Sequence, residues 1–199
     1  MLENNVVADF AEHGVWVQNS SGVTLDNNWL FNVVENKGKE PKMIEYNGWK
    51  GGFTLSESNS KMVVTNNVVA GTWHHGFHFV ARKCQNDSGN FIFSGNVAHS
   101  ISGYGAIAKN CANDCTLVSD FISYKVTQAA IMLGGPSKMN RGKNLKSIDT
   151  VYGIGIFSAG GGDVEISDSQ VYGELSDNKD CPPGSPCDHC ISSRGIILN

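Results

Sequence analysis

The sequence predicts an all-β protein, a right-handed single-stranded parallel β-helix of about seven coils. The first observation is a unit that recurs along the chain: an anchor residue followed by an apolar pair, then a short glycine-led run of alternating side chains. The second is composition, because 23 of the 199 residues are glycine and capped runs of helical period are missing. A repeat of roughly 20 to 30 residues with two short strands is typical of a solenoid; an antiparallel sandwich is the competing fold.

The anchor slot defines the repeat. Seven segments align in it: Asn5-Val6-Val7, Asn28-Trp29-Leu30, Asn67-Val68-Val69, Asn96-Val97-Ala98, Phe121-Ile122-Ser123, Thr150-Val151-Tyr152 and Gln170-Val171-Tyr172. Their spacing is loose, from 20 to 39 residues. Asn4, Asn27 and Asn66 precede three of the anchors, and asparagine tolerates left-handed turns and stacks its amides into ladders. We therefore interpret these asparagines as structural.

The glycine-led runs begin nine residues after the anchor at Gly14, Gly76, Gly105 and Ala130, later at Gly52 and Gly195, and earlier at Gly155. Because side chains alternate along a strand, every second residue of these runs should point into the core. These inward residues are Val15, Val17, Phe53, Leu55, Phe77, Phe79, Ala106, Ala108, Ile131, Leu133, Ile196 and Leu198. The residues between them should point outward: Trp16, Thr54, His78, Ile107, Met132, Phe157 and Ile197. This outward stripe is mostly apolar, which fits either scattered exposed residues or a face covered by another surface.

Two insertions, residues 32–51 and 174–194, interrupt a single domain that spans residues 1–199. Both leave the coil at the same corner, and insertions at one corner gather on one edge of a solenoid, often the binding edge. Tyr46, Trp49 and Trp73 along this edge are therefore candidates for binding a glycan or another partner.

Charge and cysteine usage restrict the setting. The net charge of -4 contains no block of like charge, so we expect no nucleic-acid partner, and no apolar run approaches the ~20 residues of a membrane-spanning helix. The sequons at Asn19 and Asn86 predict glycosylation, and six cysteines form an even set of disulfide candidates: Cys84, Cys111, Cys115, Cys181, Cys187 and Cys190. Together they favour an extracellular location.

Neither end of the chain shows a cap or a leader segment, because Leu2-Glu3-Asn4 begins in register and Ile196-Ile197-Leu198 ends on a strand. We therefore expect the segment either to continue into further coils of a longer chain or to stack end to end on copies of itself into filaments.

Few residues suggest chemistry. Corner and surface positions explain His74, His75 and His78 better than a metal site does, since only two of them can meet. Cys181, Cys187, His189 and Cys190 resemble a zinc ligand set, but three ligands within four residues favour disulfides. No cofactor is expected.

One acidic pair resembles an active site. Asp120 and Asp149 share the position before the anchor in adjacent coils, so we expect them one strand spacing apart, within the range of carboxylates that hydrolyse sugars. Asparagine fills the same position in earlier coils, which marks it as a turn. Catalysis, calcium binding and simple solvation stay open for this pair.

The stretch from Val69 to Cys84, followed by Asn-Val-Ala-His-Ser at residues 96–100, resembles the β-helix repeats of the fibrocystin family. That resemblance implies an extracellular, disulfide-permissive scaffold on a cell or ciliary surface, without established catalysis. We therefore expect a structural or adhesive segment. The alternatives are a carbohydrate-active β-helix, a polysaccharide lyase or hydrolase that uses Asp120 and Asp149, and a non-catalytic module that binds glycans.

Overall fold

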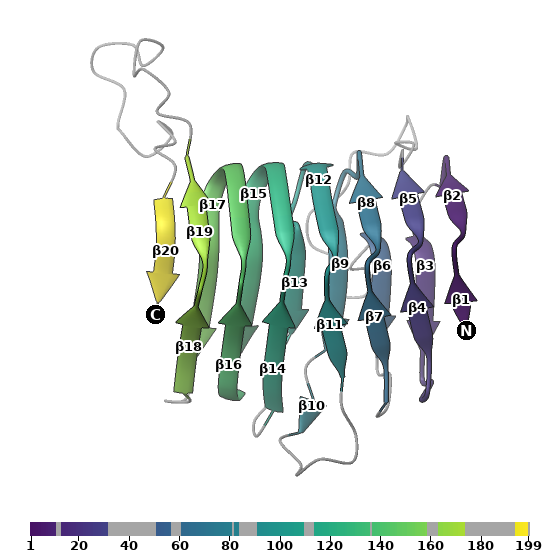
Figure 1. The fold of residues 1–199 in the computed structure, drawn as a ribbon, viewed down its shortest axis with the longest axis horizontal. Coiled ribbons are helices and arrows are strands. Elements are labelled where there is room, and N and C mark those ends of the chain that lie inside the picture. The colour runs from purple at the N-terminus through teal and green to yellow at the C-terminus, as the bar shows by residue number, and fades with distance from the viewer. Residues whose placement is uncertain are drawn as a thin grey trace.

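The computed structural model describes residues 1–10, 13–31, 51–56, 61–80, 82–83, 91–109, 114–135, 137–158, 163–173 and 194–198. Every regular element in these ranges is a strand, and the strands stack along one axis into a parallel β-helix of seven coils with three faces (Figure 1). The predicted fold class and coil number are therefore confirmed. The right-handed sense stays a prediction of the usual crossover preference.

The first face is a sheet of parallel strands, one from each coil. They are β1 (Leu2–Glu3), β4 (Thr24–Asp26), β7 (Val63–Thr65), β11 (Ile92–Ser94), β14 (Asp114–Ser119), β16 (Ser137–Lys143) and β18 (Asp163–Ser167). A short strand, β10 (Arg82–Lys83), joins this face by antiparallel pairing with β14.

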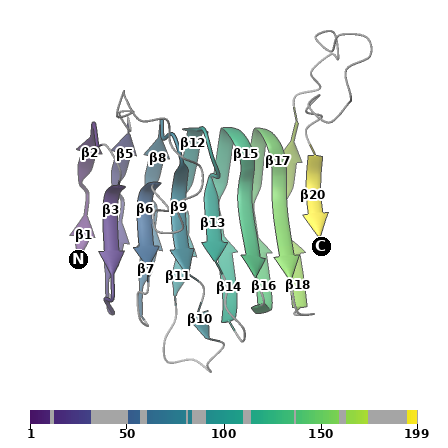
Figure 2. The same cartoon turned by 180° about the vertical axis from the view of Figure 1, so that it is seen from behind.

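The second and third faces follow in each coil. The second face holds β2 (Val6–Ala8), β5 (Trp29–Phe31), β8 (Val68–Ala70), β12 (Val97–Ile101) and β19 (Gln170–Tyr172). The third face holds β3 (His13–Gln18), β6 (Gly51–Ser56), β9 (His75–Val80), β13 (Ala106–Lys109) and β20 (Arg194–Leu198), seen from behind in Figure 2. Two long strands, β15 (Ile122–Gly135) and β17 (Lys146–Ser158), run from the second face into the third.

The strand register corrects the last two anchors. Ile122 pairs with Lys146, and Lys146 pairs with Gln170, so the residues in the anchor slot are Leu145 and Ser169. The sequence alignment had placed Thr150 and Gln170 there, which was wrong. With the corrected anchors, the last three coils repeat every 24 residues (145 − 121 and 169 − 145). The error arose because the later coils have no asparagine in the slot.

The same register corrects one outward position. A shift between Val126 and Ala129 removes one residue from β17 relative to β15, so Met132 pairs with Gly155. Phe157 pairs with Gly134 and lies two residues beyond the slot in which the sequence had placed it.

Both insertions occupy the second corner, between the second and third faces. One lies between the end of β5 at Phe31 and the start of β6 at Gly51, and the other between the end of β19 at Tyr172 and the start of β20 at Arg194. Gly51 and Arg194 are thus strand residues, although the sequence assigned them to the insertions. The expectation that both insertions leave at one corner is confirmed.

Glycine at the start of each third-face strand has a steric cause. A Cβ added at Gly52 would lie 2.4 Å from Val69 Cγ1, and one at Gly105 would lie 2.4 Å from Ser123 Oγ. The side chains of the second face therefore fill the space in front of these two glycines, whereas coil five accepts a methyl group at the equivalent position, Ala130.

The core is aromatic in its centre. Phe53 and Phe77 stack with their ring centroids 5.2 Å apart, and Phe93 and Phe121 meet Phe77 edge to face at 5.3 and 6.0 Å. Most of the predicted inward residues are buried: Phe53, Leu55, Phe77, Phe79, Ala106, Ala108, Ile131 and Leu133. Val15 and Val17 pack partly buried against this cluster. The side chains of Ile196 and Leu198 lie outside the described residues.

The outward stripe of the third face departs from expectation. Trp16 is 59% exposed, but Ile107 is only 8% exposed, and His78 and Thr54 are buried as well. Met132 is half-buried. The stripe is thus not a continuous exposed surface. The side chains of Phe157 and Ile197 lie outside the described residues.

Candidate functional site: the turn ladder and the second face

The first corner, between the first and second faces, turns through a left-handed residue in every coil. These residues are Asn4, Asn27, Asn66, Gly95, Asp120, Asn144 and Asp168, with φ between 51° and 69°. Asparagine, aspartate and glycine accept this conformation at the lowest cost. The predicted turn role of the asparagines is therefore confirmed, and Asp120 shares it.

Behind these turns, the anchor asparagines form a ladder of amides through the first four coils. Asn67 Oδ1 accepts hydrogen bonds from Asn28 N and Asn28 Nδ2, both at 2.9 Å, and Asn67 Nδ2 donates to Asn96 Oδ1 at 3.0 Å. Asn67 Nδ2 also donates to the carbonyl of Leu25 at 2.9 Å. Since Asn28, Asn67 and Asn96 are fully buried, these bonds satisfy polar groups that have no access to water.

The ladder changes composition after the fourth coil. Phe121 and Leu145 take the same slot in coils five and six and are buried in the core. In coil seven, Ser169 Oγ accepts a hydrogen bond from Leu145 N at 3.1 Å and donates to Ser167 O at 2.8 Å. Amide pairing thus gives way to apolar packing along the axis.

Asp120 lies in the outer row of the same corner, where its carboxylate joins three coils. Asn144 Nδ2 donates to Oδ1 at 2.7 Å, and Ser94 Oγ donates to Oδ2 at 2.8 Å. These hydrogen bonds, that of Asn144 first, hold the pKa of Asp120 below its usual value. Asp26 accepts comparable bonds from Thr65 and Asn66, which lower its pKa in the same way.

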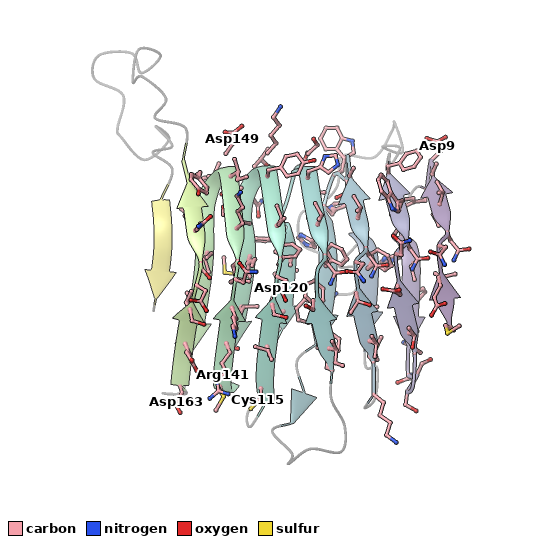
Figure 3. The ribbon with its side chains drawn as sticks, in the orientation of Figure 1. Asp9, Cys115, Asp120, Arg141, Asp149 and Asp163 are labelled. Atoms are coloured by element: carbon pink, nitrogen blue, oxygen red, sulfur yellow. The ribbon has the colours of Figure 1, made fainter. Side chains whose placement is uncertain are left out.

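The proposed acidic pair does not exist. Asp149 has φ of 52° and belongs to the second corner, in register with Lys125, whereas Asp120 is in register with Asn144 (Figure 3). Figure 3 places Asp149 at the same edge as Asp9, on the far side of the second face from Asp120. The prediction failed because it relied on Thr150 as the sixth anchor.

The histidines of the central coils lie at the start of the third face. His75 Nδ1 accepts a hydrogen bond from Tyr104 N at 3.3 Å, and the His74 and His75 rings lie 6.4 Å apart. Burial, followed by the charges of His78 and His74, lowers the pKa of His75 to about 3, so this ring is neutral at physiological pH. Within the described part of the chain, no group of three or more His, Cys, Asp or Glu side chains is arranged to hold a metal ion.

Some of the residues that led us to expect glycans, disulfides or partner contacts lie within the described part of the chain. Asn19 is exposed, with φ of 49°, in the turn between β3 and β4, and Cys115 is disulfide-bonded. Trp73 is 51% exposed. The remaining candidates lie outside the described residues: Tyr46, Trp49, Cys84, Asn86, Cys111, Cys181, Cys187, His189 and Cys190. Among the described residues there is also no helix of sufficient length and hydropathy to cross a membrane.

An exposed apolar strip covers the second face, and the sequence reasoning missed it. Each coil contributes two outward positions, which stack in register as two columns. The first column is Val6, Trp29, Val68, Val97, Ile122, Lys146 and Gln170; the second is Ala8, Phe31, Ala70, His99, Tyr124, Ile148 and Tyr172. Val6 is 68% exposed and Trp29 53%. The signal was present one and three residues after each anchor.

Comparison with known proteins relates this β-helix to a mouse protein. Fibrocystin of Mus musculus is 26% identical over 155 residues, which cover 77% of this chain. The chain is fibrocystin-like. Fibrocystin of Canis lupus familiaris gives 24% identity over the same share. No family model matches the sequence, and no solved structure does.

The fibrocystin-like relationship confirms the resemblance inferred from the repeat motifs. It concerns a small part of the relatives, because the aligned segment spans 4% of the length of mouse fibrocystin and 4% of the dog protein. The similarity therefore supports the shared repeat. It does not show that the activity or partners of fibrocystin belong to this chain.

Proposed function

We propose that this fibrocystin-like chain is a non-catalytic structural segment of an extracellular β-helix, a scaffold or adhesive element at a cell or ciliary surface. The observation that supports it most directly is the first corner. Its polar side chains bond to one another from coil to coil: the amides of Asn28, Asn67 and Asn96 inside, and the carboxylate of Asp120 outside. Such bonds hold the coils in register, which is a structural role.

The experiment that tests the absence of catalysis is depolymerisation of a panel of acidic and neutral polysaccharides. We expect no release of fragments from wild-type protein. The enzyme alternative requires cleavage that disappears in Asp120→Asn, with Asp149→Asn as the matched control at the other corner. Cleavage lost in Asp120→Asn and retained in Asp149→Asn would overturn the proposal.

The extracellular location is supported by the disulfide at Cys115 and by the exposed sequon at Asn19. Expressed behind a secretion signal in animal cells, the chain is expected to carry a glycan at Asn19. The intact mass before and after deglycosylation measures this, and Ser21→Ala, which destroys the sequon without changing Asn19, is the control. Retention of an unglycosylated, reduced chain inside the cell would count against the location.

The same proposal includes continuation along the solenoid axis. In the described residues, the faces end on β1, β2 and β3 on one side and on β18, β19 and β20 on the other. Either further coils of the same chain or a second copy would extend the parallel pairing from these edges. Electron microscopy of native material, combined with the mass of the denatured chain, distinguishes the two. A monodisperse monomer of 199 residues with ordered ends would refute both.

A second candidate function is glycan binding without catalysis, and the exposure of Trp73 favours it. Indole rings at wet surfaces supply large apolar contacts together with one hydrogen-bond donor. We expect Trp73→Ala to lower retention on an immobilised glycan if this function exists, and Leu117→Ala on the first face, also 50% exposed, to leave it unchanged. Equal retention of both variants would exclude Trp73 as the contact.

A further inference from the structure

The apolar strip on the second face goes beyond the scaffold role, because a solvated sheet face normally alternates polar with apolar residues along its strands. Its two columns run through all seven coils, and Lys146 is the one lysine, arginine or acidic residue among them. Contiguous exposed apolar surface of this kind usually marks an interaction site. The exposed fractions of Trp29, Phe31 and Tyr172 range from 40% to 53%.

Two rings of the strip are stacked along the solenoid axis, and a lysine covers a third ring, which limits what these side chains can contact. His99 and Tyr124 are nearly parallel, at 5° and 4.6 Å between centroids, and Lys146 Nζ lies 5.5 Å from the centre of the Tyr172 ring. At these two places the neighbouring coil covers the face of a ring. A sugar stacks on an open ring face, whereas a second sheet packs against a ridged row of side chains with the same strand repeat.

We propose that the second face pairs with the second face of another copy of this chain, related by a two-fold axis that runs parallel to the strands through coil four. This operation keeps each column opposite itself and places coil one against coil seven, two against six and three against five. In the second column, Ala8 then faces Tyr172 and Ala70 faces Tyr124. In the first column, Trp29 faces Lys146.

The two tyrosine pairings are complementary in size. Each tyrosine meets an alanine, so that a projecting side chain enters the space left by a small one, as in interfaces with good packing. Lys146, whose Nζ lies over the Tyr172 ring of its own chain, comes opposite the indole ring of the partner, so that its charge lies between two aromatic rings. In the second column Phe31 faces Ile148. With the two-fold axis along the solenoid instead, each coil would face itself and Trp29 would meet Phe31, so that two aromatic side chains would compete for the same space.

The strip is narrow, so the pair should be weak. Seven coils at ~4.8 Å and three residues at ~3.3 Å give a footprint of roughly 34 by 10 Å, about 340 Å² on each copy. This is about half of the ~800 Å² per partner of a standard stable interface. We therefore expect a weak dimer of this chain, with a Kd in the micromolar range or above, and a tighter one for a longer chain with more coils.

Sedimentation equilibrium of wild-type protein and three variants tests the pairing. Ala70→Tyr places tyrosine against Tyr124 of the partner and is expected to weaken the dimer about tenfold, while Tyr124→Ala leaves a gap and weakens it about fivefold. The double variant with both changes restores one tyrosine opposite one alanine. The Kd of the double variant is expected to return to within about threefold of wild type, the non-additive result that contact between these positions across the dimer predicts.

Leu117→Ala on the first face is the matched control and should leave Kd unchanged, and circular dichroism confirms that each variant is folded. End-to-end stacking along the solenoid axis, which belongs to the proposed scaffold function, would give an open series of oligomers. Pairing of the second faces gives a dimer, so the two proposals can fail independently. A wild-type chain that stays monomeric to about 1 mM overturns the proposal and assigns the strip to a different partner. A dimer that tolerates Ala70→Tyr, or a double variant as weak as the sum of its parts, overturns it as well.

Discussion

Replacing Asn67 by alanine removes the central rung of the buried amide ladder. Asn67 takes part in four side-chain hydrogen bonds: it accepts from Asn28 N and Nδ2, both at 2.9 Å, and donates to Leu25 O at 2.9 Å and Asn96 Oδ1 at 3.0 Å. At about 1 to 1.5 kcal/mol for each bond, Asn67→Ala should lower the free energy of unfolding by about 4 to 6 kcal/mol. That exceeds the usual effect of a point mutation and is comparable with the whole stability of many domains.

Urea unfolding followed by circular dichroism measures this loss, and Asn66→Gly is the matched control. Asn66 is the neighbouring turn residue, with φ of 56°, and its exposed amide makes one bond, to Asp26 at 2.9 Å. Glycine keeps the left-handed turn, so this variant should lose about 1 kcal/mol or less. If Asn67→Ala costs no more than Asn66→Gly, the ladder does not stabilise the coils and the reasoning fails.

Two further predictions concern the third face. Gly52→Ala places a Cβ 2.4 Å from Val69 Cγ1 and 2.8 Å from the carbonyl of Gly76, so thermal melting should show a loss of about 1 to 3 kcal/mol. An unchanged melting temperature would contradict this. The pKa of His75, about 3 when folded, lies below the ~6.5 of an unfolded chain, so the unfolded state binds more protons in between. His75 should make stability fall by roughly 1.4 kcal/mol per pH unit below ~6.5, and His75→Gln should remove this contribution and leave that of His99, whose pKa burial also lowers.

The sequence allowed the fold to be predicted because four coils carry an asparagine in the anchor slot. A buried amide that bonds its equivalents in neighbouring coils must recur in register, so Asn5, Asn28, Asn67 and Asn96 marked the repeat correctly. Once apolar packing replaces the amides, any hydrophobic residue fits the slot. The sequence alignment therefore placed Thr150 in the slot in place of Leu145. This error put Asp149 in the position equivalent to Asp120 and so produced the expected catalytic pair.

The candidate surface was less predictable than the fold. The third face and the second face both alternate, and both have apolar side chains at outward positions. Residues such as Ile107 and His78 are nevertheless buried, while Trp29 and Val6 are exposed. Which of two apolar faces meets water depends on what the rest of the chain covers, and that information is not contained in the alternation of one strand.

The two halves of the solenoid resist tension along its axis by different means. Coils one to four are held to one another by short strands and a buried amide at each first corner, whereas β15 and β17 pair over almost their whole length. Force applied at the ends passes through the coil-to-coil bonds in series, so the terminal coil peels away before its neighbour is disturbed. Each coil of 24 residues then releases roughly 80 Å of extended chain. A β-helix built from such coils would lengthen by one such step for each coil that detaches.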